Sequence, residues 1–406
     1  MLDQSQSGGS REVGIILSRL IAQNLPSQGF RVLIGVPKEI KTHEYRVGMV
    51  PANVREATSI GHRVLVETSA GARQGLTDED YRAAGATIVG TAQEVFAQAD
   101  LIVKVKEPQA AEIRMLRAGQ TIFTYLHLAA DAQLTQGLLG AGVTAIAYET
   151  VTGARGGLPL LSPMSEVAGR MAVQVGARCL EMAQGGRGVL LGGTASVAPA
   201  KVAILGAGVA GLNAVRAAVG AEARVTCLDI DLNRISELDQ RFGATLTTLL
   251  STRQAVEDAV LEADLVICSV LVPGAATPKL ISTSLVQAMK RGSVIVDISI
   301  DQGGCAETSK PTSHAAPTYV DHGVVHYCVT NMPGAVARTS TIALNNATLP
   351  FVLALAGKGV LAALREDPHL QNGLNVHDGR VTHPAVAKAL GLELISAAEA
   401  VSRGWR

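Results

Sequence analysis

Four ionisable side chains with catalytic potential follow apolar, strand-like stretches of the sequence: Arg46, Lys106, His127 and Asp301. In a parallel β-sheet, ligands collect beyond the carboxyl ends of the strands, which is where these side chains are expected. An arginine can hold a carboxylate by two parallel hydrogen bonds, and a lysine can hold a carboxylate or a carbonyl oxygen. A neutral imidazole suits general acid–base catalysis beside a carbonyl. These residue types predict a site that binds a small carboxylate and moves a proton.

Two of these assignments compete with a neighbouring residue. Lys104 and Lys106 in ADLIVKVKEP share one face by the period of two of a strand, and Lys106 is preferred because it lies nearer the strand end. In GSVIVDISIDQGGC, Asp301 precedes a Gly-Gly pair and is expected on a tight loop, whereas Asp297 is expected as a structural acceptor within the strand. For all four candidates, an ordinary surface, turn or hydrogen-bonding role is the structural alternative.

Histidine and cysteine spacing predicts neither a metal site nor a disulfide framework. His322 and His326 are four residues apart, but the valines between them indicate a strand, where this spacing does not make a ligand pair. The five cysteines are odd in number and contain no CxxC pair, so they are expected as reduced thiols of a cytosolic chain.

The segment KVAILGAGVAG has the pattern of a strand, a glycine-rich turn and a helix. Gly206 would allow the tight turn, Gly208 would let a pyrophosphate approach the backbone, and Gly211 would let the helix pack close to the strand. The start of the helix would offer unpaired N–H groups to the phosphates. A second apolar run, RVTCLDID, reaches Asp229 18 residues after Gly211. The order of these features predicts a dinucleotide site, and an empty structural turn is the alternative.

The acid at the end of the second strand bears on the choice of cofactor. A carboxylate at Asp229 can accept both hydroxyls of an adenosine ribose and would repel a 2′-phosphate, which favours NAD over NADP. Asp231 is the rival position, but the apolar run has ended before it. Arg234 weakens the preference slightly, because a nearby arginine can accommodate the phosphate.

Composition and segment order place these candidates in two α/β domains. The chain has 406 residues, 48% of them hydrophobic, and a formal net charge of zero, so nothing favours nucleic acid as a partner, and no membrane span is expected. Strand-like and helix-like segments alternate from Arg31 onward, which predicts parallel βαβ units. A signal peptide is not expected at the N-terminus, because Asp3 and Arg19 do not fit the pattern of one. Residues 1–30 are expected to be a flexible extension instead.

With these segments collected, the chain resembles the alanine dehydrogenases from about Arg31 to at least Pro350. The stretches that carry the resemblance are GVPKEIKTHEYRV, VKVKEP, TYLHLA, PMSEVAGRMAVQVGA, GGRGVLLGG, GAGVAG, VLVPGAATPKL, VDISIDQGGCAETSKPT and NMPGAVARTST. The implied fold is α/β, with two Rossmann-like doubly wound parallel-sheet domains separated by an active-site cleft. The expected boundaries give a discontinuous substrate domain, 31–159 with 338–406, and an NAD-binding domain, 160–337.

The resemblance implies reversible, NAD-dependent oxidative deamination of L-alanine to pyruvate and ammonium by a cytoplasmic hexamer. It assigns Arg46 and Lys106 to substrate binding, and His127 and Asp301 to catalysis. The expected cofactor-binding residues are Ser165, Gly206, Gly208, Val209, Gly211, Asp229, Arg234, Ser251, Val270, Leu271, Ile298, Asp301, Val329, Asn331 and Met332.

The sequence departs from the family pattern in two places, and two other functions are considered beside the one that the resemblance implies. The extension has no counterpart in the family pattern, and a Glu/His magnesium pair of some members falls on Ala354 and Lys358, so no metal is carried over. The related NAD-binding subunit of proton-translocating transhydrogenase would have a membrane partner, but it lacks the histidine of TYLHLA. A non-catalytic NAD-binding module would tolerate loss of the four candidate residues, and all four are present.

Overall fold

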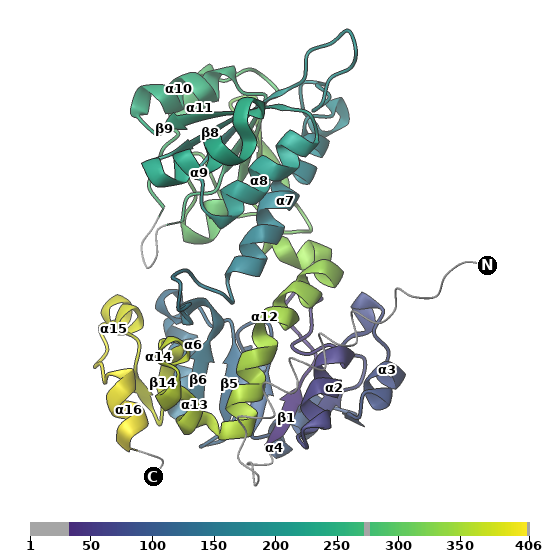
Figure 1. Cartoon of the computed structure of the whole chain (residues 1–406), viewed down its shortest axis with the longest axis vertical. Helices are drawn as coiled ribbons and strands as arrows, with labels where there is room; N and C mark the ends of the chain where they lie inside the picture. The colour runs from purple at the N-terminus through teal and green to yellow at the C-terminus, as the bar shows by residue number, and fades with distance from the viewer. Residues whose placement is uncertain (1–31, 272–276, 404–406) are drawn as a thin grey trace, which may run out of the picture. The chain divides into compact units, whose positions relative to one another are not determined.

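The computed structural model describes residues 32–271 and 277–403 and divides the chain into two compact units (Figure 1). Unit 1 contains the described residues up to Leu161 and those from Ala337 onward, and unit 2 runs from Ser162 to Val336. The expected extension, residues 1–30, lies outside the described residues.

Unit 1 is built on an eight-stranded sheet in the order β15-β14-β6-β5-β4-β1-β2-β3. Strands β1 to β6 pair in parallel, whereas β14 runs antiparallel to both β6 and β15. The strands are β1 (Leu33–Val36), β2 (Arg63–Glu67), β3 (Thr87–Val89), β4 (Leu101–Val103), β5 (Thr121–Thr124), β6 (Thr144–Ala147), β14 (Leu374–His377) and β15 (Arg380–Val381). The central strands β4, β5 and β6 are buried along their whole length, as expected where helices cover both faces of a parallel sheet.

The helices of unit 1 fill the intervals between strands and the C-terminal part of the chain. Thr77 and Thr91 begin α3 and α4 with capping boxes, in which each threonine accepts the backbone N–H of an acidic residue three positions later. The helices are α2 (Pro51–Ser59), α3 (Asp78–Ala83), α4 (Ala92–Gln98), α5 (Ala110–Ile113), α6 (Ala132–Ala141), α12 (Ala337–Lys358), α13 (Val360–Glu366), α14 (Pro368–Gln371), α15 (Pro384–Leu390) and α16 (Ala397–Arg403). The segment after Leu370, which is weakly patterned in sequence, therefore forms two strands and two helices.

Unit 2 is built on a seven-stranded sheet in the order β12-β13-β11-β10-β7-β8-β9, parallel except for β12. Its strands are β7 (Lys201–Leu205), β8 (Arg224–Asp229), β9 (Leu246–Leu250), β10 (Leu265–Cys268), β11 (Val294–Asp297), β12 (Thr318–Asp321) and β13 (Val324–Tyr327). Its helices are α7 (Ser162–Cys179), α8 (Val209–Gly220), α9 (Leu232–Phe242), α10 (Arg253–Glu262) and α11 (Thr283–Ala288). Separate apolar clusters bury the two faces of the sheet. The predicted α/β class, with two parallel-dominated sheets, is confirmed.

A helical stretch, Met332–Lys358, contains the last residues of unit 2 and the whole of α12. It has the length and hydropathy of a membrane span, and it is the single such stretch in the part of the chain that the structure describes. Of its most apolar window, 56% is buried within the protein. Buried core helices meet the same criteria of length and composition, so this stretch is weak evidence for a span.

Candidate active site

Strand register in unit 1 brings four chain segments to one edge of the sheet. Thr124 on β5 pairs with Ala147 on β6, and Val103 on β4 pairs with Phe123 on β5, so the residues after these three strands lie side by side. Strand β1 pairs with the other side of β4. The segments that follow β1, β4, β5 and β6 therefore meet at the carboxyl edge, where parallel sheets bind ligands.

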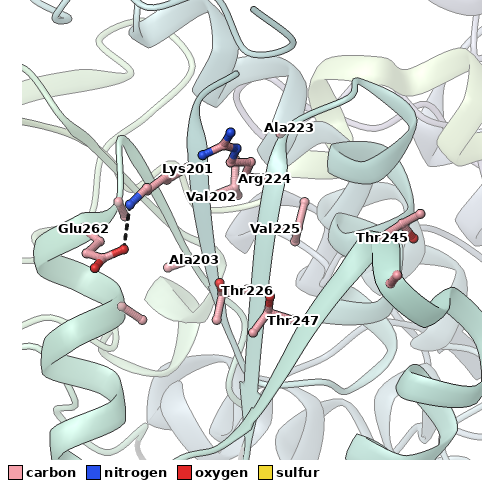
Figure 2. Close-up of a pocket in the computed structure, with 13 residues that line it drawn as sticks. Lys201, Val202, Ala203, Ala223, Arg224, Val225, Thr226, Thr245, Thr247 and Glu262 are labelled. Atoms are coloured by element: carbon pink, nitrogen blue, oxygen red, sulfur yellow. Dashed lines mark hydrogen bonds and ion pairs between the residues drawn. The ribbon is translucent and has the colours of Figure 1, made fainter. Parts of the chain in front are cut away.

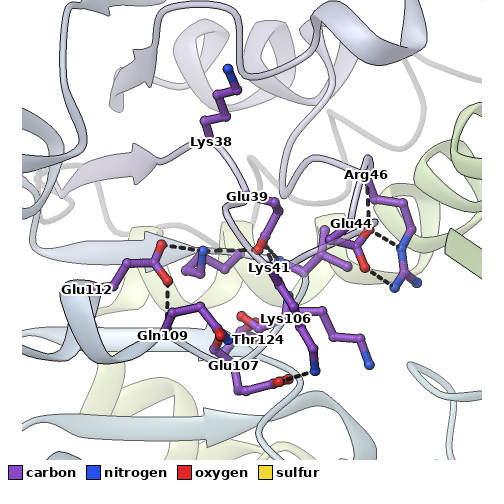
Figure 3. Close-up of polar contacts among 12 residues, drawn as sticks. Lys38, Glu39, Lys41, Glu44, Arg46, Lys106, Glu107, Gln109, Glu112 and Thr124 are labelled. Atoms are coloured by element: carbon purple, nitrogen blue, oxygen red, sulfur yellow. Dashed lines mark hydrogen bonds and ion pairs between the residues drawn. The ribbon is translucent and has the colours of Figure 1, made fainter. Parts of the chain in front are cut away.

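Arg46 is buried in the segment after β1, with 2% of its surface exposed. Its Nε and Nη2 donate to the two carboxylate oxygens of Glu44 at 2.7 and 2.6 Å, and its backbone N–H donates to the same carboxylate at 3.0 Å (Figure 3). Burial alone would lower the pKa of Arg46, but the hydrogen bonds and charge of Glu44 outweigh it and raise the pKa. A solvated charged loop, the structural alternative for this residue, is therefore wrong.

Backbone contacts hold the segment that carries Arg46 against β4 and α12. A Cβ at Gly48 would lie 2.3 Å from the carbonyl oxygen of Val103, so only glycine fits there. The buried side chain of Asn345 on α12 accepts the N–H of Val50 at 2.7 Å and donates to the carbonyl of Val47 at 3.0 Å. These contacts fix the backbone on the C-terminal side of the arginine.

Lys104 follows β4 and is fully buried between two carboxylates. Its Nζ lies 3.1 Å from Glu39 and 2.7 Å from Glu112. Burial alone would lower the pKa of Lys104, but the two carboxylates outweigh it and raise the pKa, so the lysine stays charged. With both partners in the interior, Lys104 is a structural cation, and Lys106 remains the substrate-binding candidate on this segment.

Lys106 is half-buried, and its backbone is bonded on both sides. Its N–H donates to Glu39 at 3.2 Å, and its carbonyl accepts from Thr124 Oγ1 at 2.9 Å. Its Nζ lies 6.0 Å from the centre of the Tyr125 ring, within reach of a cation–π attraction. The ammonium thus starts from a fixed backbone position next to the segment after β5.

His127, after β5, has a backbone conformation that non-glycine residues adopt only when neighbours hold it. Its φ is +54°, and Glu149 accepts its N–H at 2.6 Å and the N–H of Leu126 at 3.2 Å. The same carboxylate lies 3.4 Å from His127 Nδ1, while the imidazole is 47% exposed. Burial would raise the pKa of Glu149, but the charge and hydrogen bonds of His127 lower it overall. Such a strained, carboxylate-oriented histidine is characteristic of a functional position.

Glu149 is the site residue that sequence reasoning missed. It comes directly after the apolar run VTAIAY, so the rule that selected His127, a polar residue at the carboxyl end of a strand, could have selected it. Glu39 and Glu44 lie in the charged stretch KEIKTHEYR after β1, and their partners Lys104, Lys106 and Arg46 appear only in the folded structure.

In unit 2, the glycine-rich turn follows β7, and each glycine meets a different constraint. Gly206 has φ +97°, which glycine alone adopts without strain. A Cβ at Gly211 would lie 1.8 Å from the carbonyl oxygen of Gly206, whereas a Cβ at Gly208 would meet nothing within 4 Å. Helix α8 begins at Val209, so the open side of Gly208 adjoins its unpaired N–H groups. This geometry fits a pyrophosphate approaching the backbone at a helix start.

Asp229 lies beside this turn, because Leu228 on β8 pairs with Leu205 on β7. Its carboxylate accepts the N–H of Ala207 in the turn and, at 2.8 Å, the N–H of Asp231. The Asp231 side chain accepts the N–H of Asn233 at 2.9 Å and caps α9. Asp231, the alternative candidate for the ribose acceptor, therefore has a structural role as the cap of α9.

Arg234 extends from the first turns of α9 on the exposed surface. It forms an ion pair with Glu237 at 2.6 Å, one turn further along the helix.

The loop that carries Asp301 is held at both ends. Asp297 is fully buried and accepts the N–H of Cys305 at 2.7 Å and the hydroxyl of Ser309 at 2.6 Å, as expected for a structural acceptor. Lys279 donates to three carbonyls of the loop, those of Gly303, Gly304 and Ala306, at 2.6 to 3.0 Å. Burial raises the pKa of Asp297. Asp301 itself is exposed.

The other predicted cofactor residues of unit 2 follow the carboxyl ends of its strands, except for two on helices. Ser251 follows β9, Ile298 follows β11, and Val209 and Ser165 lie in α8 and α7. Leu271, after β10, is 52% exposed, whereas Val329 and Met332, after β13, are buried. The remaining two are Val270, whose carbonyl accepts from Ser299 at 2.8 Å, and Asn331, at φ +59°.

A pocket in unit 2 lies at the opposite edge of the sheet from the glycine-rich turn. Figure 2 shows it beside the first residues of β7 and β8, including Lys201, Arg224 and Thr226. Lys201 pairs with Glu262 of α10 at 2.7 Å across its rim. Ligands of parallel sheets bind at the carboxyl ends of the strands, so this pocket does not fit the dinucleotide.

The cysteines and the arrangement of potential metal ligands complete the description of the two units. All five cysteines are buried, and none forms a disulfide. Burial raises the pKa of Cys179 to about 11 and that of Cys227 to about 12, which opposes thiolate chemistry there. Within the described ranges, no group of three or more His, Cys, Asp or Glu side chains is arranged to hold a metal ion.

Comparisons with known proteins agree with this architecture over most of the chain. Residues 35–168 match the family model "Alanine dehydrogenase/PNT, N-terminal domain", and residues 172–384 match its C-terminal counterpart. The alanine dehydrogenase of Halomonas elongata is 59% identical over 91% of this chain and 99% of its own, and that of Bacillus subtilis is 52% identical over 91% and 98%. A solved L-alanine dehydrogenase has a TM-score of 0.86 at 53% identity, covering 88% of this chain and 99% of its own. A transhydrogenase from Sinorhizobium meliloti has a TM-score of 0.75 at 26% identity, covering 86% and 100%.

Proposed function

The chain belongs to the alanine dehydrogenase/PNT family, and on that premise we propose that it catalyses the reversible oxidative deamination of L-alanine to pyruvate and ammonium with NAD. The observation that carries the proposal is the convergence of Arg46, Lys106 and His127 at one sheet edge of unit 1. A cationic pair beside an oriented imidazole suits a substrate that has a carboxylate and undergoes proton transfer.

The residues of unit 2 fit a bound dinucleotide. The start of α8 and the open side of Gly208 would receive the pyrophosphate, and Asp229 would accept the ribose hydroxyls. Arg234 is engaged by Glu237, so the nearby cation that could favour a 2′-phosphate already has a partner. Bound NAD would supply the hydride acceptor, and the protein supplies binding, orientation and proton transfer.

Substrate binding is assigned to two cationic side chains of unit 1, Arg46 and Lys106. Arg46 would hold the carboxylate, and Glu44 fixes the plane of its guanidinium by a two-point ion pair. Lys106 would bind the carboxylate and the oxygen that develops at the α-carbon. Loss of the α-hydrogen as a hydride, which bound NAD would accept, leaves an iminium carbon. Water adds to that carbon, and the resulting carbinolamine collapses to pyruvate and ammonium.

Proton transfer in those later steps is assigned to His127 and Asp301. Glu149 faces Nδ1 of His127, which leaves Nε2 to exchange a proton with the substrate oxygen or with water. Asp301 is exposed on a loop whose backbone Asp297 and Lys279 hold in place. Its carboxylate is available to accept a proton or to bind the cofactor.

One absorbance assay tests the proposal against its alternatives. NADH consumption should require pyruvate and ammonium together, and should stop when either is omitted. A transhydrogenase-type subunit, the alternative suggested by the Sinorhizobium meliloti structure, would instead transfer hydride to a second nucleotide without pyruvate. A non-catalytic module would bind NADH without consuming it. Turnover over a panel of 2-oxo acids would then define the preference for alanine over serine or glycine.

The choice of cofactor has its own test in a matched pair of variants. Asp229→Ala should weaken NAD binding by about 10-fold and relax discrimination against NADP, because the ribose loses its acceptor. Asp231→Ala removes the cap of α9 and should leave the NAD/NADP ratio unchanged. Unaltered NAD affinity in Asp229→Ala would show that the ribose assignment is wrong.

The cytoplasmic location and the hexameric state are also proposals, supported by the resemblance to the family. Light scattering on the purified full chain would measure the assembly directly, and a mass of one or two chains would contradict the hexamer.

A further inference from the structure

We propose that Glu39 is a positioning residue that fixes the backbone of Lys106, with Lys104 and Glu112 serving to hold the Glu39 carboxylate in place. The inference rests on the proposed function, in which Lys106 binds the substrate. It assigns a task to a buried ion cluster that the proposed mechanism otherwise leaves unused.

The hydrogen bonds of Glu39 point to the strand end rather than to solvent. Its Oε1 accepts the N–H of Val105 at 2.7 Å and the N–H of Lys106 at 3.2 Å, and its Oε2 accepts Lys104 Nζ at 3.1 Å. The Glu39 side chain is 2% exposed. One carboxylate thus binds three consecutive residues, 104 to 106, just after β4 ends.

Lys104 and Glu112 extend this contact to a third segment. Lys104 Nζ donates to Glu112 Oε1 at 2.7 Å, and Glu112 Oε2 accepts the N–H of Gln109 at 2.8 Å at the start of α5. In Figure 3, Glu112 and Gln109 lie on the opposite side of Glu39 from the Glu44–Arg46 pair. The segment after β1, the end of β4 and the start of α5 are therefore joined through buried charges.

A purely stabilising role does not account for a buried ion cluster of this kind. Desolvation of the charges offsets most of their attraction, and apolar replacements of similar volume are often neutral or stabilising. An apolar residue could not accept the two backbone N–H groups, however, and a buried N–H without a partner is unfavourable. Since the Lys106 carbonyl also has a partner in Thr124, the backbone of Lys106 is fixed on both sides.

The expected consequence is confined to substrate binding. If the Lys106 backbone shifts, the ammonium binds the substrate oxygens less tightly, so KM for pyruvate and alanine should rise. The dinucleotide is assigned to unit 2, so KM for NADH should stay constant.

Two triple variants separate positioning from stability. Both contain Lys104→Met and Glu112→Gln, which remove the buried charges and leave an amide oxygen for Gln109. One adds Glu39→Gln, which keeps an acceptor for the N–H groups, and the other adds Glu39→Leu, which does not. In NADH oxidation with pyruvate and ammonium, the Glu39→Gln form should keep KM for pyruvate within about 2-fold of the wild type, and the Glu39→Leu form should raise it about 10-fold or more.

Each outcome decides the matter. Equal KM values for pyruvate in the two triple variants would overturn the positioning role, as would a rise in KM for NADH in parallel with that for pyruvate. A wild type that consumes no NADH with pyruvate and ammonium would instead refute the proposed function, and the positioning role with it.

A second, single variant covers the case in which the Glu39→Leu form does not fold. Thr124→Val removes the donor to the Lys106 carbonyl and should raise KM for pyruvate by about 3-fold, with KM for NADH unchanged. An unchanged KM for pyruvate in that variant would contradict the fixed backbone.

Discussion

The candidate sites of the two units consist of different kinds of chemical groups. Unit 1 relies on charged side chains that are buried and paired, such as Arg46 with Glu44 and Lys104 with Glu39. Unit 2 relies on backbone N–H groups at the start of α8 and on the open space beside Gly208. Each choice suits the ligand assigned to that unit, because a small carboxylate needs directional cations, whereas a pyrophosphate binds well to a helix start.

The charged side chains of the two units also differ in the groups that they contact. In unit 1, carboxylate partners raise the pKa of Lys104 and of Arg46 against the effect of burial, so both side chains stay charged. In unit 2, buried Asp297 and exposed Lys279 bind mainly the backbone of one loop. Changes in unit 1 should therefore alter chemistry and substrate affinity, and changes in unit 2 should alter dinucleotide affinity.

The largest expected effect is on turnover, from His127→Ala in unit 1. Loss of the oriented imidazole should lower kcat by about 10²-fold or more, because Asp301 would be the one assigned proton-transfer group left. The dissociation constant for NADH, measured by fluorescence titration, should not change. His322→Ala, on the surface of unit 2, is the matched control and should leave kcat unaltered. Turnover at the wild-type rate would remove His127 from the mechanism.

Arg46→Lys tests whether the buried guanidinium acts as a two-point clamp. A lysine keeps the charge but cannot bond both Glu44 oxygens in one plane and also present a fork to the substrate, so KM for pyruvate should rise by about 10-fold or more. Steady-state kinetics would show this with KM for NADH constant. Arg82→Lys, at an exposed ion pair with Glu79, should change neither value. If the Arg46→Lys enzyme binds pyruvate normally, the carboxylate is held elsewhere.

Gly208→Ala makes the converse test in unit 2. The added Cβ meets no protein atom within 4 Å, so the fold should persist, but it projects where the pyrophosphate is expected, and KM for NADH should rise by about 10-fold. KM for pyruvate at saturating NADH should stay the same. Gly220→Ala, which also meets nothing within 4 Å, should behave as the wild type. Equal NADH affinity in both variants would place the pyrophosphate away from this turn.

The smallest expected effect concerns acid sensitivity, and it involves His383 in unit 1. Burial lowers the pKa of His383 below its ordinary value of 6.5, despite the charge of nearby Glu149. The unfolded chain therefore binds the proton more readily, and the stability that neutral His383 contributes above about pH 6.5 is lost as the pH falls through the folded-state pKa. His383→Gln should reduce the loss of unit 1 stability as the pH falls from about 7 to about 5.

Hydrogen exchange of unit 1 amides would measure this change, with unit 2 amides as the internal reference. An identical pH dependence in the wild type and the His383→Gln variant would show that this histidine does not titrate with folding.

The sequence itself specified the local elements and the residues at their ends. Apolar runs predicted the parallel strands, and the spacing of Gly206, Gly208 and Gly211 predicted the turn into α8, because these signals depend only on neighbours in the chain. Asp297 as a structural acceptor was also foreseeable, since it lies within an apolar run.

Only the tertiary structure decided which charges are partners. Glu39 lies 65 residues from Lys104, and Glu149 lies 22 residues from His127, and strand order brings each pair together. Burial likewise separated Lys104, a structural cation, from Lys106, although the two share one face in the sequence pattern. Sequence pattern gives the direction of a side chain relative to its own strand, but the partner and the dielectric around a charge depend on the neighbouring strands.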